Sequence, residues 1–198
     1  MSKPTRHGLS DRIDQLRKIQ SLPNYLSVSG ELDKHTSYAD LEEYRVAVLR
    51  NFSIEPIKIV LDGELALSGR QPIYYWGEYD TIAEDVFKSD SGLYKFNPSA
   101  VILGLWLETL SPALSTQFVR ANDKEIKSEV DRILSLVSSF ISRIRESIDG
   151  PILLNNFPLP GNTTLGILDS QIEAGHFELI SLLNISLRKI ANKFSGVY

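Results

Sequence analysis

The sequence predicts an α/β fold in which a parallel sheet carries helices on both faces. Four short apolar runs, at 46–49, 72–76, 99–105 and 152–154, are typical of strands that are covered on both sides. Segments with apolar residues three or four positions apart, the spacing of an amphipathic helix, lie between and after these runs. Because strands alternate with helices, we expect the strands to lie parallel in one sheet.

The composition is that of an ordinary folded protein. The chain has 198 residues, 42% of them hydrophobic and 23% charged, which suits one α/β domain with a small appendage. The absence of cysteine excludes disulfides, thiolate metal ligands and cysteine nucleophiles. A net charge of −4 and scattered basic residues argue against a nucleic-acid partner.

The sequence also predicts a cytoplasmic protein with no membrane partner. No apolar run is long enough to span a bilayer. Residues 1–12 lack the apolar core of a secretory signal.

The N-terminal residues lack the alternation of strand and helix, and we predict that they form a helical appendage. Ser10 can cap a first helix, which Pro23 should end. The elements expected here are a flexible lead over 1–8, a helix over 10–21, a loop over 24–34 and a short helix over 37–44. The predicted domains are therefore 1–44 and 45–198.

After residue 45 the predicted elements alternate. Ser53 can cap a helix whose first turn holds Glu55 and Pro56 and which Gly69 ends. The later elements expected are a turn over 77–80, a short helix from 81, a loop before the third strand, a helix or loop over 108–118 broken by Pro112, helices over 123–150 and 171–193, and a loop over 155–169.

Val197 and Tyr198 are predicted to begin a fifth strand, because they follow a complete helix and a Ser-Gly turn. This pattern predicts that the chain was cut from a longer protein. The two residues could instead be the tail of the last helix.

The polar residues that directly follow the strands are the candidate site. Ligands of an open parallel sheet bind beyond the carboxyl ends of its strands, so these residues should share one rim. The candidates are Asn51, Ser53 and Glu55 after the first strand, Gly77 after the second, Trp106 and Glu108 after the third, and Asn155 and Asn156 after the fourth.

Ser53 has two possible roles. Its hydroxyl could attack an acyl group while the first amides of the helix bind the oxyanion, or it could simply cap that helix. A nucleophilic serine also needs a base. We predict that His7, His35 and His176, the three histidines of the chain, are surface residues, so no complete triad can be drawn.

The other candidates also allow more than one role. Asn155 and Asn156 could donate to a substrate carbonyl or clamp the following loop. Glu55 and Glu108 would act as acids or bases only if buried, and Trp106 could line a pocket or complete the core. We predict no metal and no cofactor, because acidic and histidine residues show no ligand spacing and no glycine-rich phosphate loop occurs.

Several short motifs resemble a known family. The segment from Arg45 to Pro56 resembles the strand and N-F-[ST]-x-E-P motif that opens the N-terminal domain of FkbH-like proteins. Further matches follow in the same order at 77–80, 91–98, 155–157, 166–169 and 183–184. The resemblance covers about residues 45–198.

The resemblance implies a flavodoxin-like, three-layer fold similar to SGNH hydrolases, followed by a haloacid-dehalogenase-type domain that would bind Mg²⁺. It also implies a role in loading a glyceryl unit from 1,3-bisphosphoglycerate onto an acyl carrier protein for polyketide biosynthesis. The expected partners are therefore the carrier protein and the missing C-terminal domain.

By position, Ser53 falls where SGNH hydrolases have their nucleophile, Gly77 near the second oxyanion donor, and residues 106–108 near the oxyanion asparagine. The sequence departs from that pattern, because Asn51-Phe52 replaces the Gly-Asp before the serine. The Asn after the third strand, the Asp-x-x-His block, the Asp-x-Asp-x-Thr motif and the glyceryl-carrying cysteine are also missing. We therefore expect substrate or carrier binding without catalysis, with an atypical serine esterase using Ser53 as the alternative.

Overall fold

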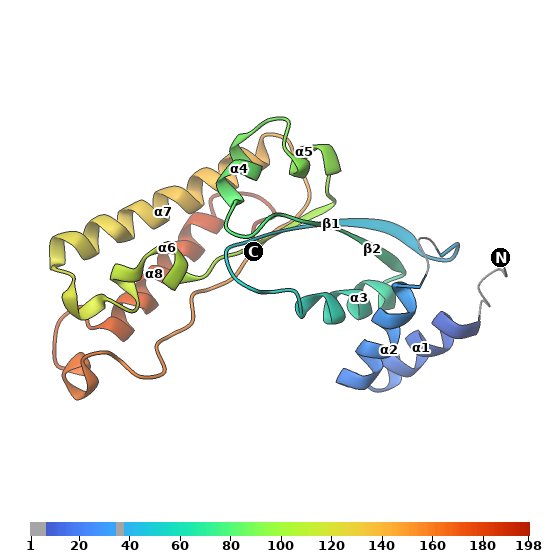
Figure 1. Ribbon diagram of the computed structural model, residues 1–198, viewed down its shortest axis with the longest axis horizontal. Helices are drawn as coiled ribbons and strands as arrows, with labels where there is room; N and C mark the ends of the chain where they lie inside the picture. The colour runs from blue at the N-terminus through green and yellow to red at the C-terminus, as the bar shows by residue number, and fades with distance from the viewer. Residues whose placement is uncertain (1–6, 35–37) are drawn as a thin grey trace. The chain divides into compact units, whose positions relative to one another are not determined.

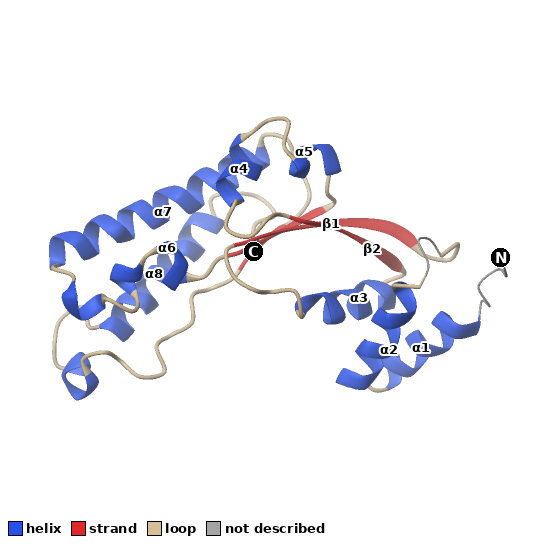
Figure 2. Cartoon of the chain, in the orientation of Figure 1, coloured by secondary structure: helices blue, strands red, loops and turns tan. Residues whose placement is uncertain are grey.

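The computed structural model of the chain describes residues 7–34 and 38–198. These residues form eight α-helices, three short 3₁₀ helices and a four-stranded sheet (Figures 1 and 2). The predicted α/β class is confirmed. The chain divides into two compact units, one of residues 1–46 and 54–74 and the other of residues 47–53 and 75–198. This division differs from a single boundary after residue 44.

The first unit is built around three helices. They are α1 (His7–Lys18), α2 (Leu22–Leu32) and α3 (Ile57–Leu67), which share a small core of Leu9, Ile13, Leu16, Val28, Leu32 and Ala66. A Cβ atom on Gly63 of α3 would lie 2.3 Å from the ring of Tyr25 in α2. Glycine at this position therefore lets the two helices approach closely.

Two predictions for this region are wrong. The expected loop over 24–34 is the helix α2, because Pro23 stands in its first turn, where proline is tolerated, and does not end the preceding helix. The expected helix over 37–44 is also absent, because the strand β1 (Glu42–Arg50) begins there. Ser37, its proposed cap, and most of the predicted lead lie outside the described residues.

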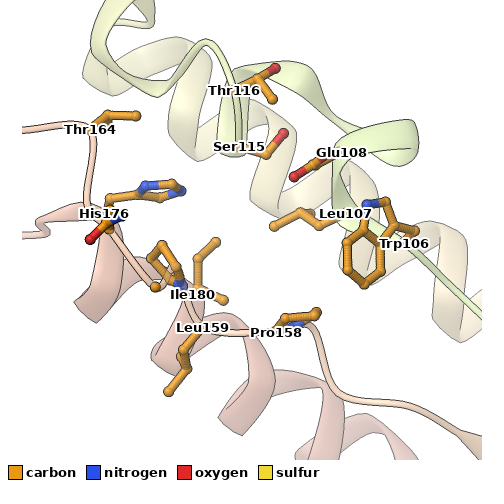
Figure 3. Close-up of a pocket in the computed structure, with 13 residues that line it drawn as sticks. Trp106, Leu107, Glu108, Ser115, Thr116, Pro158, Leu159, Thr164, His176 and Ile180 are labelled. Carbon is orange, nitrogen blue, oxygen red and sulfur yellow. The ribbon is translucent and has the colours of Figure 1, made fainter.

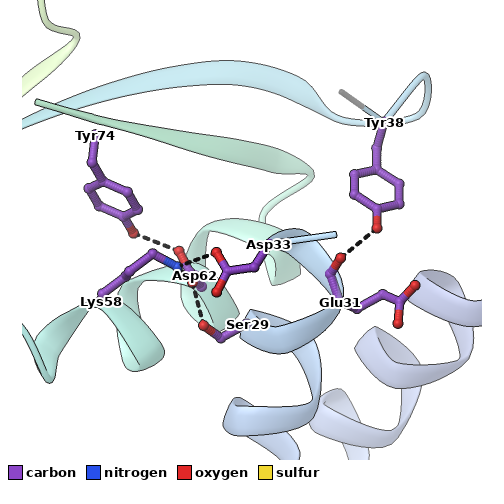
Figure 4. Close-up of polar contacts among 7 residues, drawn as sticks. All are labelled: Ser29, Glu31, Asp33, Tyr38, Lys58, Asp62 and Tyr74. Carbon is purple, nitrogen blue, oxygen red and sulfur yellow. Dashed lines mark hydrogen bonds and ion pairs between the residues drawn. The ribbon is translucent and has the colours of Figure 1, made fainter. Parts of the chain in front are cut away.

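A buried carboxylate joins α2, α3 and the strand β2 (Arg70–Trp76) (Figure 4). Asp62 of α3 is 1% exposed and accepts hydrogen bonds from Ser29 (2.6 Å), Lys58 (2.7 Å) and Tyr74 (2.8 Å). Burial and the Asp62 carboxylate raise the pKa of Tyr74. Burial lowers the pKa of Lys58, but its bonds to Asp33 and Asp62 outweigh that effect and leave this pKa raised.

Asp62→Ala is expected to lower the free energy of unfolding by about 3 kcal/mol, because Ser29 and Tyr74 lose this buried acceptor and Lys58 loses one of its two carboxylate partners. Urea denaturation measures this loss. Asp33→Ala is the matched control, since Asp33 also pairs with Lys58 but its side chain is 63% exposed, and it should cost less than about 1 kcal/mol. Equal losses in the two variants would contradict a special role for Asp62.

The sheet has the strand order β2-β1-β3-β4. In the second unit, β3 (Ala100–Gly104) and β4 (Ile152–Leu154) run parallel, with Val101 opposite Ile152. All five residues of β3 are buried, as the continuous apolar run predicts for a strand covered on both sides. Val197 forms a parallel bridge with Ile152, so the last residues pair with the sheet as predicted.

Two long helices pack into the core of the second unit. α7 (Asp123–Arg145) begins with a capping box between Asn122 and Glu125 and buries one face, and α8 (His176–Ala191) packs beside it. The buried residues that join these helices to β3 and β4 are Val101, Leu103, Ile133, Val137, Ile141, Ile144, Ile152, Ile180, Leu183 and Leu187.

The shorter elements follow the prediction less closely. α4 (Ile82–Phe87) lies where a helix was expected, and α6 (Leu107–Leu110) lies at the start of the segment for which helix and loop were both possible. α5 (Gly92–Phe96) occupies a predicted loop, since five residues are too few to show a helical period. Three short 3₁₀ helices complete the unit, namely η1 (Pro112–Leu114), η2 (Phe118–Arg120) and η3 (Gly166–Ser170). α8 begins at residue 176, after η3, and not at residue 171 as predicted.

Candidate functional site

Two asparagine side chains meet at the carboxyl end of β3. Asn51, which follows β1, accepts a hydrogen bond from the amide of Trp106 (2.6 Å) and donates one to its carbonyl oxygen (3.2 Å). Asn155, which follows β4, makes the same pair of bonds with Leu105, at 2.7 and 2.8 Å. The two side chains therefore share one rim, and both clamp the backbone that leaves β3.

A third asparagine of the same unit works in the same way. Asn184 of α8 accepts from the amide of Phe157 and donates to its carbonyl oxygen, both at 2.8 Å. The first residues of the loop after β4 are therefore held to α8. We call Asn51, Asn155 and Asn184 the clamp asparagines.

Asn51→Ala is expected to lower the free energy of unfolding by about 2–3 kcal/mol, because the amide and carbonyl of Trp106 lose their partner in a site where Asn51 is 1% exposed. Chemical denaturation followed by Trp fluorescence measures this. Asn156→Ala is the control, since Asn156 is exposed, and should change stability by less than about 0.5 kcal/mol. An Asn51 variant as stable as this control would refute the clamp.

A pocket of about 330 Å³ opens beside the clamped segment (Figure 3). Three sides are built by the residues after β3, the residues after η1, and the first turns of α8, and the loop over 158–164 closes the fourth. The labelled lining residues are Trp106, Leu107, Glu108, Ser115, Thr116, Pro158, Leu159, Thr164, His176 and Ile180.

Trp106 and Glu108 are the two predicted site residues that line this pocket. The Trp106 ring is half-buried and packs at 5.4 Å, in a tilted arrangement, against Phe52. Glu108 is exposed and stands in the first turn of α6. Figure 3 shows its carboxylate and the ring of His176 reaching into the pocket from opposite sides.

His176 was predicted to be a surface residue, and this prediction is wrong. The side chain is buried, stacks on Phe118 at 4.6 Å, and places Nε2 3.0 Å from the carbonyl oxygen of Leu114. A carbonyl oxygen only accepts, so Nε2 donates to it, while Nδ1 is buried and the described residues supply no partner for it. The signal for burial was the helical period, since Ile180 and Leu183 lie on the same face.

The side chain of Asp169, which lies before α8 in the sequence, caps the start of this helix. The carboxylate of Asp169 accepts hydrogen bonds from the amides of His176 (2.8 Å) and Phe177 (3.1 Å). A negative charge at this end of a helix is favourable because of the helix dipole. The first two amides of α8 are therefore occupied by the protein itself.

The segment that leads to Ser115 is tied to α7 by a hydrogen bond from Arg132, which also forms an ion pair within α7. Arg132 donates to the carbonyl oxygen of Leu110 (2.6 Å) and pairs with Glu129 (2.7 Å). The hydrogen bond from Arg132 lowers the pKa of Glu129 to about 2.

Glu129→Gln is expected to be less stable than the natural protein at pH 6, by up to about 1 kcal/mol, and equally stable near pH 2. The folded-state pKa of about 2 lies below the ordinary value of 4.5, so the ionised carboxylate stabilises the fold above pH 4.5 and loses this effect as the pH falls to 2. Urea unfolding at several pH values measures the difference. A difference that does not change with pH would contradict the ion pair.

Ser53 and Gly77 do not line this pocket. Ser53 is exposed, and it does not cap α3, because the helix begins at Ile57 with Pro56 in the cap position. The amide of Gly77 donates to the carbonyl oxygen of Val48 at 3.0 Å. A Cβ atom on Gly77 would also lie 2.7 Å from a carboxylate oxygen of Asp85, which explains the glycine.

Glu55 and Asn156, two further predicted site residues, do not line this pocket. Glu55 is exposed and belongs to the first unit, where its carbonyl oxygen accepts from the amide of Lys58. Asn156 is exposed, and its carbonyl oxygen accepts from the side chain of Asn155 at 3.0 Å. His35 and the side chain of His7 lie outside what the structure describes.

Neither a metal centre nor a membrane segment is found in the part of the chain that the structure describes. Within residues 7–34 and 38–198, His, Asp and Glu side chains form no group of three or more with the geometry of a metal site. Over the same described ranges, every helix is too short or too polar to cross a bilayer.

Comparison with known proteins gives a structural likeness. No family model matches the sequence, and no curated protein matches it. The chain is similar to a solved structure of the N-terminal part of the protein BF1531 from Bacteroides fragilis, described as containing a phosphatase domain complexed with Mg, with a TM-score of 0.66 and 19% identity. The match covers 86% of this chain and 44% of that one, so the chain spans less than half of the structure it resembles. At this identity the likeness shows a shared α/β fold.

Proposed function

We propose that this chain is the SGNH-like N-terminal domain of an FkbH-type protein and that it binds substrate or carrier without catalysing a reaction itself. The observation that carries the proposal is the likeness, over 86% of the chain, to the N-terminal part of a protein that contains a phosphatase domain. The ordered motifs from Arg45 to Asn184 support the same family.

The hydrogen bonds that the candidate residues already make within the protein support binding over catalysis. A serine hydrolase needs a base beside its nucleophile and free donors for the oxyanion. Here the amide of Gly77 donates to the carbonyl oxygen of Val48, and the side-chain NH₂ groups of Asn51 and Asn155 donate to backbone carbonyl oxygens. The Nε2 atom of His176 is bonded to Leu114. These groups are therefore used to hold the fold.

In the proposed reaction, a haloacid-dehalogenase-type domain with Mg²⁺ handles the phosphorylated glyceryl donor, 1,3-bisphosphoglycerate. The chain described here positions the acyl carrier protein that receives the glyceryl unit for polyketide biosynthesis. The proposal places the protein in the cytoplasm, where such carriers act.

Titration of the ¹⁵N-labelled chain with a phosphopantetheinylated acyl carrier protein tests this role. We expect amide shifts in residues 105–108, 115–116 and 156–162, which surround the pocket, because docking would change their environment. An acyl carrier protein without its arm is the control for contacts made by the carrier surface alone. Unchanged spectra with both forms at concentrations on the order of 1 mM, the weak limit of specific binding, would refute the proposal.

A further inference from the structure

We propose that a second cavity of the second unit binds a small zwitterion with an aliphatic side chain, such as a free apolar amino acid. The cavity has a volume of about 420 Å³ and shares no lining residue with the pocket beside Trp106. One wall is formed by η2 and the first two turns of α7, and the other by residues 165 and 172–174 and Leu179 of α8. We call it the α7 cavity. The inference goes beyond the proposed function and does not depend on it.

Nine of the twelve residues that line the α7 cavity are apolar. Phe118 and Leu179 are buried, whereas Val119 and Ile172, on opposite walls, are 56% and 45% exposed. Covering these two side chains with an aliphatic group is favourable, because it removes apolar surface from water. The volume lies within the range of about 300–1,000 Å³ that is typical of small-molecule sites. The ligand therefore has an apolar part that lies between the two walls.

Three charged side chains, all exposed, complete the lining. They are Asp123 and Lys127 of α7 and Glu173 of the opposite wall. Asp123 and Lys127 are one helical turn apart, the spacing at which opposite charges commonly pair. Among the described residues, however, none of the three side chains has an ion pair or a hydrogen bond. Charges of both signs are therefore available to a ligand.

A compact zwitterion matches this arrangement of charges. The Cβ atoms of residues four positions apart on a helix are about 5–6 Å from each other, so Asp123 and Lys127 can reach two charged groups on one carbon atom. The ammonium of the ligand meets Asp123 and Glu173, its carboxylate meets Lys127, and its side chain lies in the apolar part. A ligand with only a carboxylate would face two carboxylates, and a ligand with only an amine would leave Lys127 without a partner.

The turn that carries Glu173 is held by contacts within the protein. Ala174 has a φ of 57°, in the left-handed region that is unfavourable for a residue with a Cβ atom, and its amide donates to the carboxylate of Glu178 at 3.2 Å. A Cβ atom on Gly175 would lie 2.1 Å from the backbone oxygen of Asp169, so the turn also packs closely on that residue. Strained backbone persists only where its surroundings hold it, and it is common at ligand sites. Glu173 therefore projects from a turn that is already formed before a ligand binds.

Titration of the ¹⁵N-labelled chain with L-leucine tests this assignment, together with three analogues that each lack one part of leucine. 4-Methylpentanoate lacks the ammonium, 3-methylbutylamine lacks the carboxylate, and glycine lacks the side chain. We expect leucine to shift the amides of Val119, Lys127 and Ala174 in a saturable way, and each analogue to bind at least about threefold more weakly. The absence of saturable shifts up to about 10 mM leucine, a weak limit for a ligand of this size, would overturn the inference. An analogue that binds as tightly as leucine would overturn it as well.

Lys127→Gln tests the contact with the carboxylate. It should weaken leucine binding about threefold to tenfold, the range of an exposed charged hydrogen bond, and should not weaken the binding of 3-methylbutylamine, which has no carboxylate. Lys124→Gln is the matched control, because Lys124 is also exposed in the first turn of α7 but does not line the cavity. Its leucine affinity should stay within about twofold of the natural chain. Equal loss in the two variants, or a parallel loss of leucine and of the amine, would contradict the assignment.

Glu173→Gln tests the contact with the ammonium from the opposite wall. It should weaken leucine binding about threefold to tenfold and should not weaken the binding of 4-methylpentanoate, which has no ammonium. The fold should be unaffected, because the Glu173 side chain is exposed and makes no ion pair with the described residues. If both ligands are weakened by the same factor, or if neither is weakened, the cavity does not recognise a zwitterion and the inference is wrong.

Discussion

The clamp asparagines are the constraint on which the geometry of the second unit depends. A carboxamide side chain has one accepting oxygen and one donating nitrogen, so it can satisfy both backbone groups of a single residue. Asn51, Asn155 and Asn184 do this for Trp106, Leu105 and Phe157. Backbone groups that leave a sheet have no neighbouring strand to pair with, and burying them unpaired would be costly. The clamps allow two loops to turn next to the core, and the pocket forms where these loops meet.

Most of the second unit could be predicted from the sequence because its signals are strong. Few other structures explain the continuous apolar runs of β3 and β4, or the apolar residues that recur every three or four positions along α7. The first unit was harder, because Pro23 can either end a helix or stand in the first turn of the next one. The spacing of Val28 and Leu32 on one face was the better signal there.

The convergence of two candidate side chains could be predicted from the sequence, but their hydrogen-bond partners could not. Placing polar residues at the ends of strands correctly brought Asn51 and Asn155 together, because that follows from the topology of a parallel sheet. Whether a side-chain amide faces a ligand or a backbone group depends on distances of a few ångströms between loops. The burial of His176 likewise depends on a detail of packing, namely the rotation of α8 that places this ring on Phe118.

The loop over 158–168 is held at both ends and sparsely packed between them. Asn184 fixes Phe157 before it, and the carboxylate of Asp169 fixes the start of α8 after it, while most residues between are exposed, with Ile167 at 81%. Opening such a segment breaks few contacts. Its backbone amide hydrogens should therefore exchange with solvent far more readily than those of the strands and of α7. This side of the pocket can therefore move to admit ligands of different width, while the strands and α7 keep their positions.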